Sequence, residues 1–453
     1  MRRLLFIAYY FPPVGGAGTQ RSSKFAKYLP ENGFLPVVIS ADHKPSMDRW
    51  SPIDLSLQAD LFSGVEVWRP ECQQANLNSL SCRLHQKLRS VLGLPNRAIA
   101  EWGRKVVQTA TKLHEINRFH AVYLSMSPFD VAHSIADFSN KYQIPLAMDL
   151  RDPWALDEMQ MYPSSLHRKM EKNRMHRALM KADTIIMNTP ESLHRLCDTF
   201  SDFKKKRVVT ITNGFDADDF INQKSVCNHE HFTIVHTGYL QYEMGMHLQK
   251  SRFAYETMGR IVQGVDFLTR SHYYLLKAIK QWLREDPSVR SSIQIKLVGS
   301  LTAGDLSLVK QFDFAELIAC TGYLPHDQTT AHMLDADLLF LPMHNLPKDH
   351  RATIVPGKTY EYMATGRPIL AAVPEGDARD FLTRAGTGLV CQPDDLNGMV
   401  RILSAQYDCW RQGRSSVQID TSYLKQFERR SLTAKLACEF TGLLNDTCAM
   451  DNY

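Results

Sequence analysis

The sequence predicts an α/β protein with two Rossmann-like domains that face each other across a cleft. The 453 residues are too many for one ordinary hydrophobic core. Short apolar runs alternate with helical stretches, which is typical of parallel sheets covered on both faces. This alternation occurs twice, on either side of a polar stretch. We therefore expect an N-terminal domain at 1–218, a hinge at 219–230, a C-terminal domain at 231–422, and a final helix with a tail at 423–453 that returns to the first domain.

Each strand is predicted from an apolar run of four to six residues, because a strand buried on both faces lacks polar alternation. These runs lie at 4–8, 35–40, 121–124, 145–148, 184–187 and 207–211 in the first half, and at 233–236, 293–298, 338–341, 369–372 and 388–391 in the second. The main helical stretches lie at 20–29, 98–113, 164–180, 271–285, 329–334, 356–365 and 423–444. Residues 241–263 are polar, Met-rich and weakly patterned, so we expect a loop or lid there.

Composition narrows the class of protein. The nine cysteines are odd in number and form no C-x-x-C pair, which favours a reducing, cytoplasmic compartment and argues against a zinc site. No apolar stretch is long enough to span a membrane. Residues 1–218 carry 29 Lys and Arg against 22 Asp and Glu, which suits an anionic membrane surface or a phosphorylated substrate. No nucleic-acid recognition motif accompanies this charge.

The segment 355–370, VPGKTYEYMATGRPIL, is the most informative one. Its Pro-Gly turn begins a short helix that Gly366 and Pro368 end. Lys358 and Glu361 lie on one face of this helix. A lysine at a helix N-terminus favours a diphosphate, and the carboxylate can accept hydrogen bonds from sugar hydroxyls. A capped surface helix with an exposed ion pair is the alternative.

Glycine turns follow the first strand of each predicted domain. The first contains Gly16 and Gly18, and it fits neither a Walker loop nor the dinucleotide fingerprint. The second contains Gly238. Such turns let backbone N–H groups approach an anionic or polyhydroxy ligand, although a plain tight turn explains them equally well.

Charged side chains follow two other strands of the first half. Asp149, Arg151 and Asp152 lie at a strand end, which faces the crevice of a doubly wound sheet, and His133 lies near another. The alternative is a salt-bridged loop and a structural histidine. The pairs at 216/218 and 335/337 resemble metal-binding Asp-x-Asp sequences, but we interpret them as turn residues and assign no metal.

Together these motifs resemble glycosyltransferase family 4, whose members have the two-domain GT-B fold. The resemblance is strongest to the branch of bacterial surface polysaccharide biosynthesis. It rests on the segments 9–18 (YYFPPVGGAG), 149–154 (DLRDPW), 212–216 (TNGFD), 236–238 (HTG) and 356–368 (PGKTYEYMATGRP).

The resemblance implies a metal-independent, retaining transferase that moves a hexose or N-acetylhexosamine from a nucleotide-diphosphate sugar to a glycan or lipid-linked acceptor. It implies that Lys358 and Glu361 bind the diphosphate and ribose, that the turns at Gly16, Gly18 and Gly238 approach the donor, and that His133 acts at the donor sugar or acceptor. Together with Asp149 and Arg151, His133 forms our predicted catalytic set. A non-catalytic GT-B scaffold protein, or a sugar-nucleotide epimerase or hydrolase, is the alternative.

The sequence departs from the family in two places. Thr353 occupies the position of the family's first glutamate, beside the donor sugar. The usual Arg/Lys pair after the glycine turn is also missing, so Lys250, Arg252 or Arg260 is expected to replace it. Separately, Leu84, Leu88, Val91 and Leu92 form an apolar face beside basic residues, which predicts either peripheral membrane contact or packing on the domain itself.

Overall fold

The computed structural model describes residues 1–42, 53–61, 64–71, 96–221 and 230–450. The chain forms two compact units, one of Met1–Asn213 with Arg429–Tyr453 and one of Gly214–Glu428. We call them the N-terminal and the C-terminal unit. Most of the expected hinge and the whole predicted membrane face lie outside the described residues.

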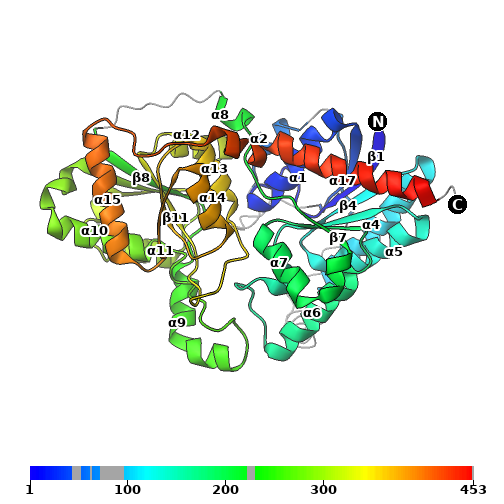
Figure 1. The fold of residues 1–453 in the computed structure, drawn as a ribbon, viewed down its shortest axis with the longest axis horizontal. Coiled ribbons are helices and arrows are strands. Elements are labelled where there is room, and N and C mark those ends of the chain that lie inside the picture. The colour runs from blue at the N-terminus through cyan, green and yellow to red at the C-terminus, as the bar shows by residue number, and fades with distance from the viewer. Residues whose placement is uncertain (43–52, 62–63, 72–95, 222–229, 451–453) are drawn as a thin grey trace. The chain divides into compact units, whose positions relative to one another are not determined.

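The N-terminal unit is built on a parallel sheet whose described strands have the order β3-β2-β1-β4-β5-β6-β7. Their bounds are β1 Arg2–Ala8, β2 Phe34–Ile39, β3 Glu66–Trp68, β4 Ala121–Met126, β5 Leu146–Leu150, β6 Thr184–Met187 and β7 Arg207–Thr210. The helices are α1 Ala17–Tyr28, α2 Leu55–Ala59, α4 Arg97–Ile116, α5 Ala132–Tyr142, α6 Ser165–Leu179, α7 Pro190–Thr199 and α17 Arg429–Met450 (Figure 1).

Both faces of this sheet are covered, which explains why the strands are continuous apolar runs. Along β1, Leu5 and Ile7 join the core under α4 and α5, whereas Leu4 and Phe6 join the core that includes α1 and α17. Successive side chains of a strand point to opposite faces, so each run supplies both cores.

The C-terminal unit repeats this architecture, with the strand order β10-β9-β8-β11-β12-β13. The strands are β8 Phe232–Thr237, β9 Ile293–Val298, β10 Ile318–Gly322, β11 Leu338–Pro342, β12 Ile369–Ala372 and β13 Gly388–Cys391. The helices are α8 Asp218–Ile221, α9 Tyr242–Thr257, α10 Tyr273–Glu285, α11 Ala303–Val309, α12 His326–Leu334, α13 Gly357–Thr365, α14 Asp377–Ala385, α15 Leu396–Arg411 and α16 Thr421–Leu424 (Figure 1). The predicted fold class, with two parallel-sheet Rossmann-like domains, is confirmed.

Two predicted elements need correction. Residues 241–263 are not a loop throughout, because Tyr242–Thr257 is helix α9. This helix is fixed by close backbone packing and not by a periodic apolar face. A Cβ added to Gly245 would lie 2.5 Å from the Cα of Leu268. The final helix also begins at Arg429 rather than 423, because Phe427 is buried in the C-terminal unit's core.

Helix α17 returns to the N-terminal unit, as predicted. Leu432, Leu436, Phe440 and Leu443 form a stripe at helical spacing and are buried in the core with α1. The ring of Phe440 lies 5.6 Å from that of Phe34. The last segment of the chain therefore completes the core of the first domain.

Replacing Phe440 with alanine should destabilise the N-terminal unit by about 3–5 kcal/mol, because the side chain is fully buried and would leave a cavity. The exposed Lys435→Ala change in the same helix is the control. Hydrogen exchange in urea, followed in peptides of β1, measures the effect. Equal stability of the two variants would contradict the packing role of α17.

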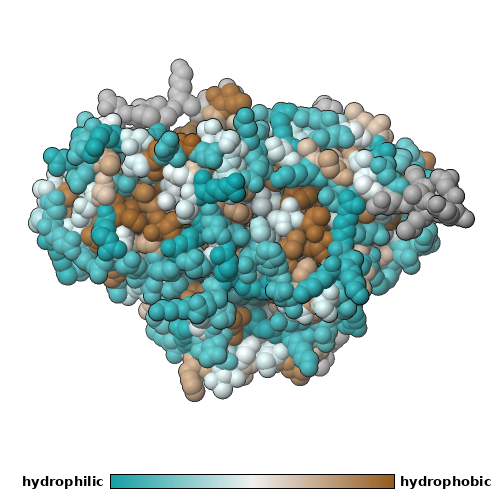
Figure 2. Space-filling view, in the orientation of Figure 1, coloured by the Kyte–Doolittle hydropathy of each residue, from teal (hydrophilic) through white to brown (hydrophobic). Residues whose placement is uncertain are grey.

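The visible surface is mostly hydrophilic, with separate apolar patches over each unit (Figure 2). Among the described helices, none is both long and apolar enough to cross a membrane.

Candidate functional site

Helix α13 presents the predicted donor residues at the edge of the C-terminal sheet. It begins at Gly357 after the N-cap Pro356 and ends at Gly366, whose φ of 70° is left-handed. The strand order changes direction between β8 and β11, and the loops after these strands carry Gly238 and lead to α13. Ligands of open α/β sheets bind at such a switch point. The local signals in 355–370 therefore place a helix N-terminus where a ligand is expected.

Lys358 lies directly over the end of β8. Its Nζ donates a hydrogen bond to the carbonyl oxygen of Thr237 and lies 3.3 Å from His236 Nε2. His236 Nδ1 lies 2.9 Å from the carbonyl oxygen of Phe340, which can only accept, so Nδ1 carries the proton and Nε2 accepts from Lys358. A Cβ on Gly238 would lie 2.9 Å from Lys358 Nζ. Glycine therefore leaves room for the ammonium group.

The charge on Lys358 is poorly compensated. Burial, together with the positive charge of Arg270, lowers its pKa to about 7, although Glu361 opposes the shift. Burial also holds the pKa of His236 well below its usual range, so this ring is neutral. A bound phosphate would supply the missing negative charge and restore the protonated lysine.

Arg270 is the cation that the sequence reasoning missed. It precedes α10, and its carbonyl accepts from the backbone N–H of Gln241 at 3.1 Å. Of the expected substitutes, Arg252 pairs with Glu256 at 2.9 Å and Arg260 lies over the Tyr255 ring at 4.2 Å. The helix predicted at 271–285 could have drawn attention to a basic residue at its start.

Glu361 lies one helical turn after Lys358 and is mostly buried, with 15% of its side chain exposed. Its Oε1 is 3.8 Å from His326 Nε2, which in turn lies 3.1 Å from Asp219 Oδ2. The shorter contact satisfies His326, so Glu361 keeps acceptor capacity for ligand hydroxyls. Thr353, where the resemblance to family 4 places a glutamate, is fully buried.

Two glycines shape the edge of this sheet. Gly238 has a φ of 90° and Gly299, at the end of β9, has a φ of 135°. A Cβ on Gly299 would lie 2.9 Å from the carbonyl oxygen of Gly238. The two turns are therefore packed backbone to backbone, which only glycine permits.

In the N-terminal unit the glycine turn meets Arg151. Gly16 has a φ of 90° and precedes α1. A Cβ on Gly18 would lie 2.2 Å from Arg151 Nη1, so the guanidinium rests on the turn that follows β1. Arg151 also contacts Asp152, with 3.3 Å between Nε and Oδ2. The predicted residues Gly18 and Arg151 thus come together.

His133 lies in the first turn of α5, beyond the end of β4. Burial lowers its pKa, and the positive charges of Lys181, Arg174 and Arg177 lower it further, while Asp137 opposes them. Strands β1 and β4 flank the switch point of the N-terminal sheet, so the glycine turn and His133 lie on its two sides.

Asp149 differs from its predicted neighbours because it points into the core. Its carboxylate accepts from Arg21 Nε at 2.7 Å and Arg21 Nη2 at 2.9 Å, and also from the hydroxyl of Tyr123. Both ion-pair partners are 1% exposed. Arg21 further donates to the carbonyl oxygens of Ile211 and Thr212. This placement argues against a catalytic role for Asp149. It favours a positioning role, in which the Arg21–Asp149 pair holds α1 against the end of β5.

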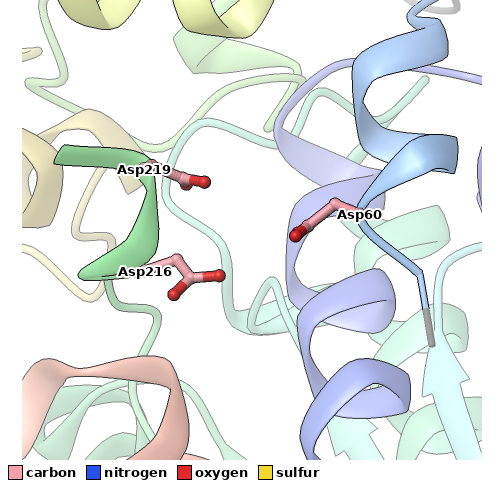
Figure 3. Close-up of side chains that lie close together, drawn as sticks. All are labelled: Asp60, Asp216 and Asp219. Atoms are coloured by element: carbon pink, nitrogen blue, oxygen red, sulfur yellow. The ribbon is translucent and has the colours of Figure 1, made fainter. Parts of the chain in front are cut away.

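Three further carboxylates, Asp60, Asp216 and Asp219, are shown in Figure 3. Asp60 belongs to the N-terminal unit, where it pairs with Lys24 at 2.7 Å. Asp219 lies in α8 and Asp216 just before it, and Asp219 contacts His326. Because Asp60 and Asp219 have partners within their own units, we assign no metal to these carboxylates.

Comparison with known proteins defines the fold of the chain. Two Rossmann-like units of this kind form the GT-B fold of glycosyltransferases. Among solved structures, sucrose-phosphate synthase (tll1590) from Thermosynechococcus elongatus is similar over 98% of this chain and 100% of that chain, at 12% identity and a TM-score of 0.67. Anabaena Alr3699/HepE in complex with UDP and glucose is similar over 100% and 99%, at 17% identity and a TM-score of 0.53.

A Listeria monocytogenes protein assigned as a UDP-N-acetylglucosamine 2-epimerase shares the fold as well, over 96% and 94% of the two chains, at 11% identity and a TM-score of 0.51. Residues 259–407 match the family model described as Glycosyl transferases group 1. The matched segment contains Arg270, Lys358 and Glu361. Among curated proteins, none matches the sequence.

Proposed function

We propose that the protein is a retaining glycosyltransferase that moves a hexose or N-acetylhexosamine from a nucleotide-diphosphate sugar to a glycan or lipid-linked acceptor in cell-surface polysaccharide biosynthesis. The observation that carries the proposal is the position of Lys358. Its ammonium group lies over Gly238 at the switch point of the sheet, and its positive charge is only partly compensated by neighbouring residues. The family match of residues 259–407 supports the same conclusion.

In this proposal the diphosphate and the ribose of the donor have partners in the C-terminal unit. Lys358 and Arg270 bind the diphosphate, whose charge stabilises both cations. Glu361 accepts hydrogen bonds from the ribose hydroxyls. The turn at Gly238 brings backbone close to the phosphates. Since Alr3699/HepE is described in complexes with UDP and with UDP-glucose, uridine donors are the first to test.

The N-terminal unit supplies Gly16, Gly18, Arg151 and His133, which we assign to the donor sugar and the acceptor. Asp149 is buried and ion-paired, so we do not use it as a nucleophile. In front-face retention the leaving phosphate itself takes the acceptor proton, and no protein nucleophile is needed. The chain then contributes positioning and leaving-group stabilisation, without a metal. We place the reaction in the cytoplasm, with the basic first half at an anionic membrane surface.

Glu361→Gln should weaken binding of the nucleotide-sugar donor by about 10- to 100-fold, because it removes a charged hydrogen-bond acceptor. Calorimetric titration with UDP-glucose, or with the best donor from a thermal-shift screen, measures the effect. Glu285→Gln, at the exposed end of α10, is the matched control. Equal affinities of the two variants would remove the ribose assignment.

A donor-consumption assay with and without membrane extract separates the alternatives. Consumption that needs the extract supports the transferase. Full activity without any acceptor would indicate an epimerase or hydrolase. No consumption of any common sugar nucleotide would indicate the scaffold protein.

A further inference from the structure

A cavity of about 580 Å³ lies in the N-terminal unit, between α4, the first turn of α5 and α6. Its polar lining consists of Arg104, Asp130, His133, Ser134, Arg174 and Arg177. Its volume is in the range of small-molecule sites. Three guanidinium groups therefore converge on a space of ligand size against one carboxylate.

The three arginines are not equivalent. Arg174 Nη2 lies 2.5 Å from Asp130 Oδ1, and its other Nη lies 3.6 Å from Glu171, so its charge is balanced. Within the described part of the chain, Arg104 and Arg177 have no carboxylate partner. Arg104 lies on α4 and Arg177 on α6, so the two side chains could contact a bound anion from two sides. Asp130 balances Arg174, so the solvent-exposed Arg104 and Arg177 leave the cavity with a net positive charge.

The imidazole of His133 is a further polar group of this cavity. Its half-buried ring lines the cavity. Burial, and then the positive charges of Lys181, Arg174 and Arg177, lower the pKa of this ring. Ser134 beside it adds a hydroxyl from the first turn of α5. Guanidinium groups with a hydroxyl and an imidazole form the donor set that binds phosphate oxygens.

We propose that this cavity binds a phosphate group of the acceptor, with Arg104 and Arg177 as the two guanidinium partners and His133 and Ser134 as further donors. Binding of the phosphate follows from the cavity alone, and its assignment to the acceptor rests on the proposed transferase function. A free sugar phosphate and a phosphate-bearing lipid headgroup share this chemistry.

Two titrations test the site in the full-length protein and in the Lys358→Met background, which removes anion binding by the donor site. One uses glucose 6-phosphate, with glucose as its uncharged match. The other uses phosphatidylcholine vesicles with and without phosphatidic acid. The double variant Arg104→Gln/Arg177→Gln should lose about tenfold or more in affinity in whichever arm binds. Lys105→Gln, the exposed neighbour on α4 outside the cavity lining, should change nothing.

Loss of glucose 6-phosphate binding in the double variant assigns the site to a soluble sugar phosphate, and loss of vesicle binding assigns it to a lipid headgroup. Absence of binding in both arms, or binding that survives in the double variant, would overturn the proposal. A parallel titration with UDP-glucose distinguishes the transferase function from the cavity assignment. If the wild type binds phosphate in the cavity but binds no sugar nucleotide, the proposed function is refuted and the cavity assignment stands.

Discussion

Replacing Lys358 with methionine should lower the affinity for the nucleotide-sugar donor by about 30-fold or more. The reason is that a desolvated cation facing a diphosphate is lost, and removal of one partner from such a pair costs about 2–5 kcal/mol. Lys310→Met, at the exposed end of α11, is the control. Calorimetric titration of the donor measures both variants. Unchanged affinity in Lys358→Met would place the donor elsewhere.

The same lysine should make donor binding depend on pH. In the free protein the pKa of Lys358 is about 7, because of burial and the positive charge of Arg270, with Glu361 acting in the opposite direction. Neutral His236 adds no charge there. The bound diphosphate raises the lysine pKa, so affinity is full below pH 7 and falls by up to about tenfold per pH unit above it.

A nucleotide sugar is the correct probe for this pH dependence, because its diphosphate diester has no ionisation near neutrality. Titrations between pH 6 and pH 9 should show the decline in the wild type. In Lys358→Met the affinity should be low and independent of pH. A wild-type affinity that stays constant over this range would show that Lys358 does not take up a proton when the donor binds.

Helix α13 could be predicted because its signals are local. Pro356 and Gly357 begin α13 and Gly366 ends it, so the positions of Lys358 and Glu361 follow from three nearby residues. Most strands were predictable for a similar reason, since burial on both faces makes each one an apolar run. Strand β10 escaped notice because it lies at the sheet edge, is largely exposed, and ends in Thr321 and Gly322, so it is not a continuous apolar run.

Tertiary contacts determine what the sequence did not reveal. Helix α9 has only Gly245 and Leu248 buried among its sixteen residues, so no apolar period marks it. The positive charge of Arg270 lowers the pKa of Lys358, although the two residues are 88 positions apart in the chain. Helix and strand periodicity cannot predict a contact between residues so far apart. Its approach depends on a contact between the segment before α10 and the loop after β8, where the backbone N–H of Gln241 donates to the carbonyl oxygen of Arg270.

The direction of Asp149 shows the limit most clearly. A strand end was correctly expected there, but the side chain's face depends on the register of β5. Met148 and Leu150 join the core under α4 and α5, whereas Ala147 joins the core with α1 and α17. Asp149 therefore shares the face of Ala147 and meets Arg21 on α1. The sequence could not show that this partner lies 128 residues away.

Asp149→Asn should destabilise the N-terminal unit by about 3–5 kcal/mol, because it leaves the Arg21 guanidinium buried without a counter-charge. In the wild type, burial lowers the pKa of Arg21, but the Asp149 carboxylate outweighs it and the net shift is upward. In the variant the guanidinium still keeps its proton, because arginine is not deprotonated in proteins. Hydrogen exchange in urea, read in peptides covering β5, measures the loss. Peptides covering β9 in the C-terminal unit serve as the internal control.

Arg21→Met provides the decisive contrast. Here the buried group left behind is a carboxylate, which can take up a proton, and the hydroxyl of Tyr123 still donates to it. Its destabilisation should therefore shrink as the pH falls from 8 to 5, whereas that of Asp149→Asn should stay constant. If Asp149 were instead a catalytic group, Asp149→Asn would keep the stability of the wild type and lose only turnover. A stable, inactive Asp149→Asn variant would thus refute the positioning role that the buried ion pair implies.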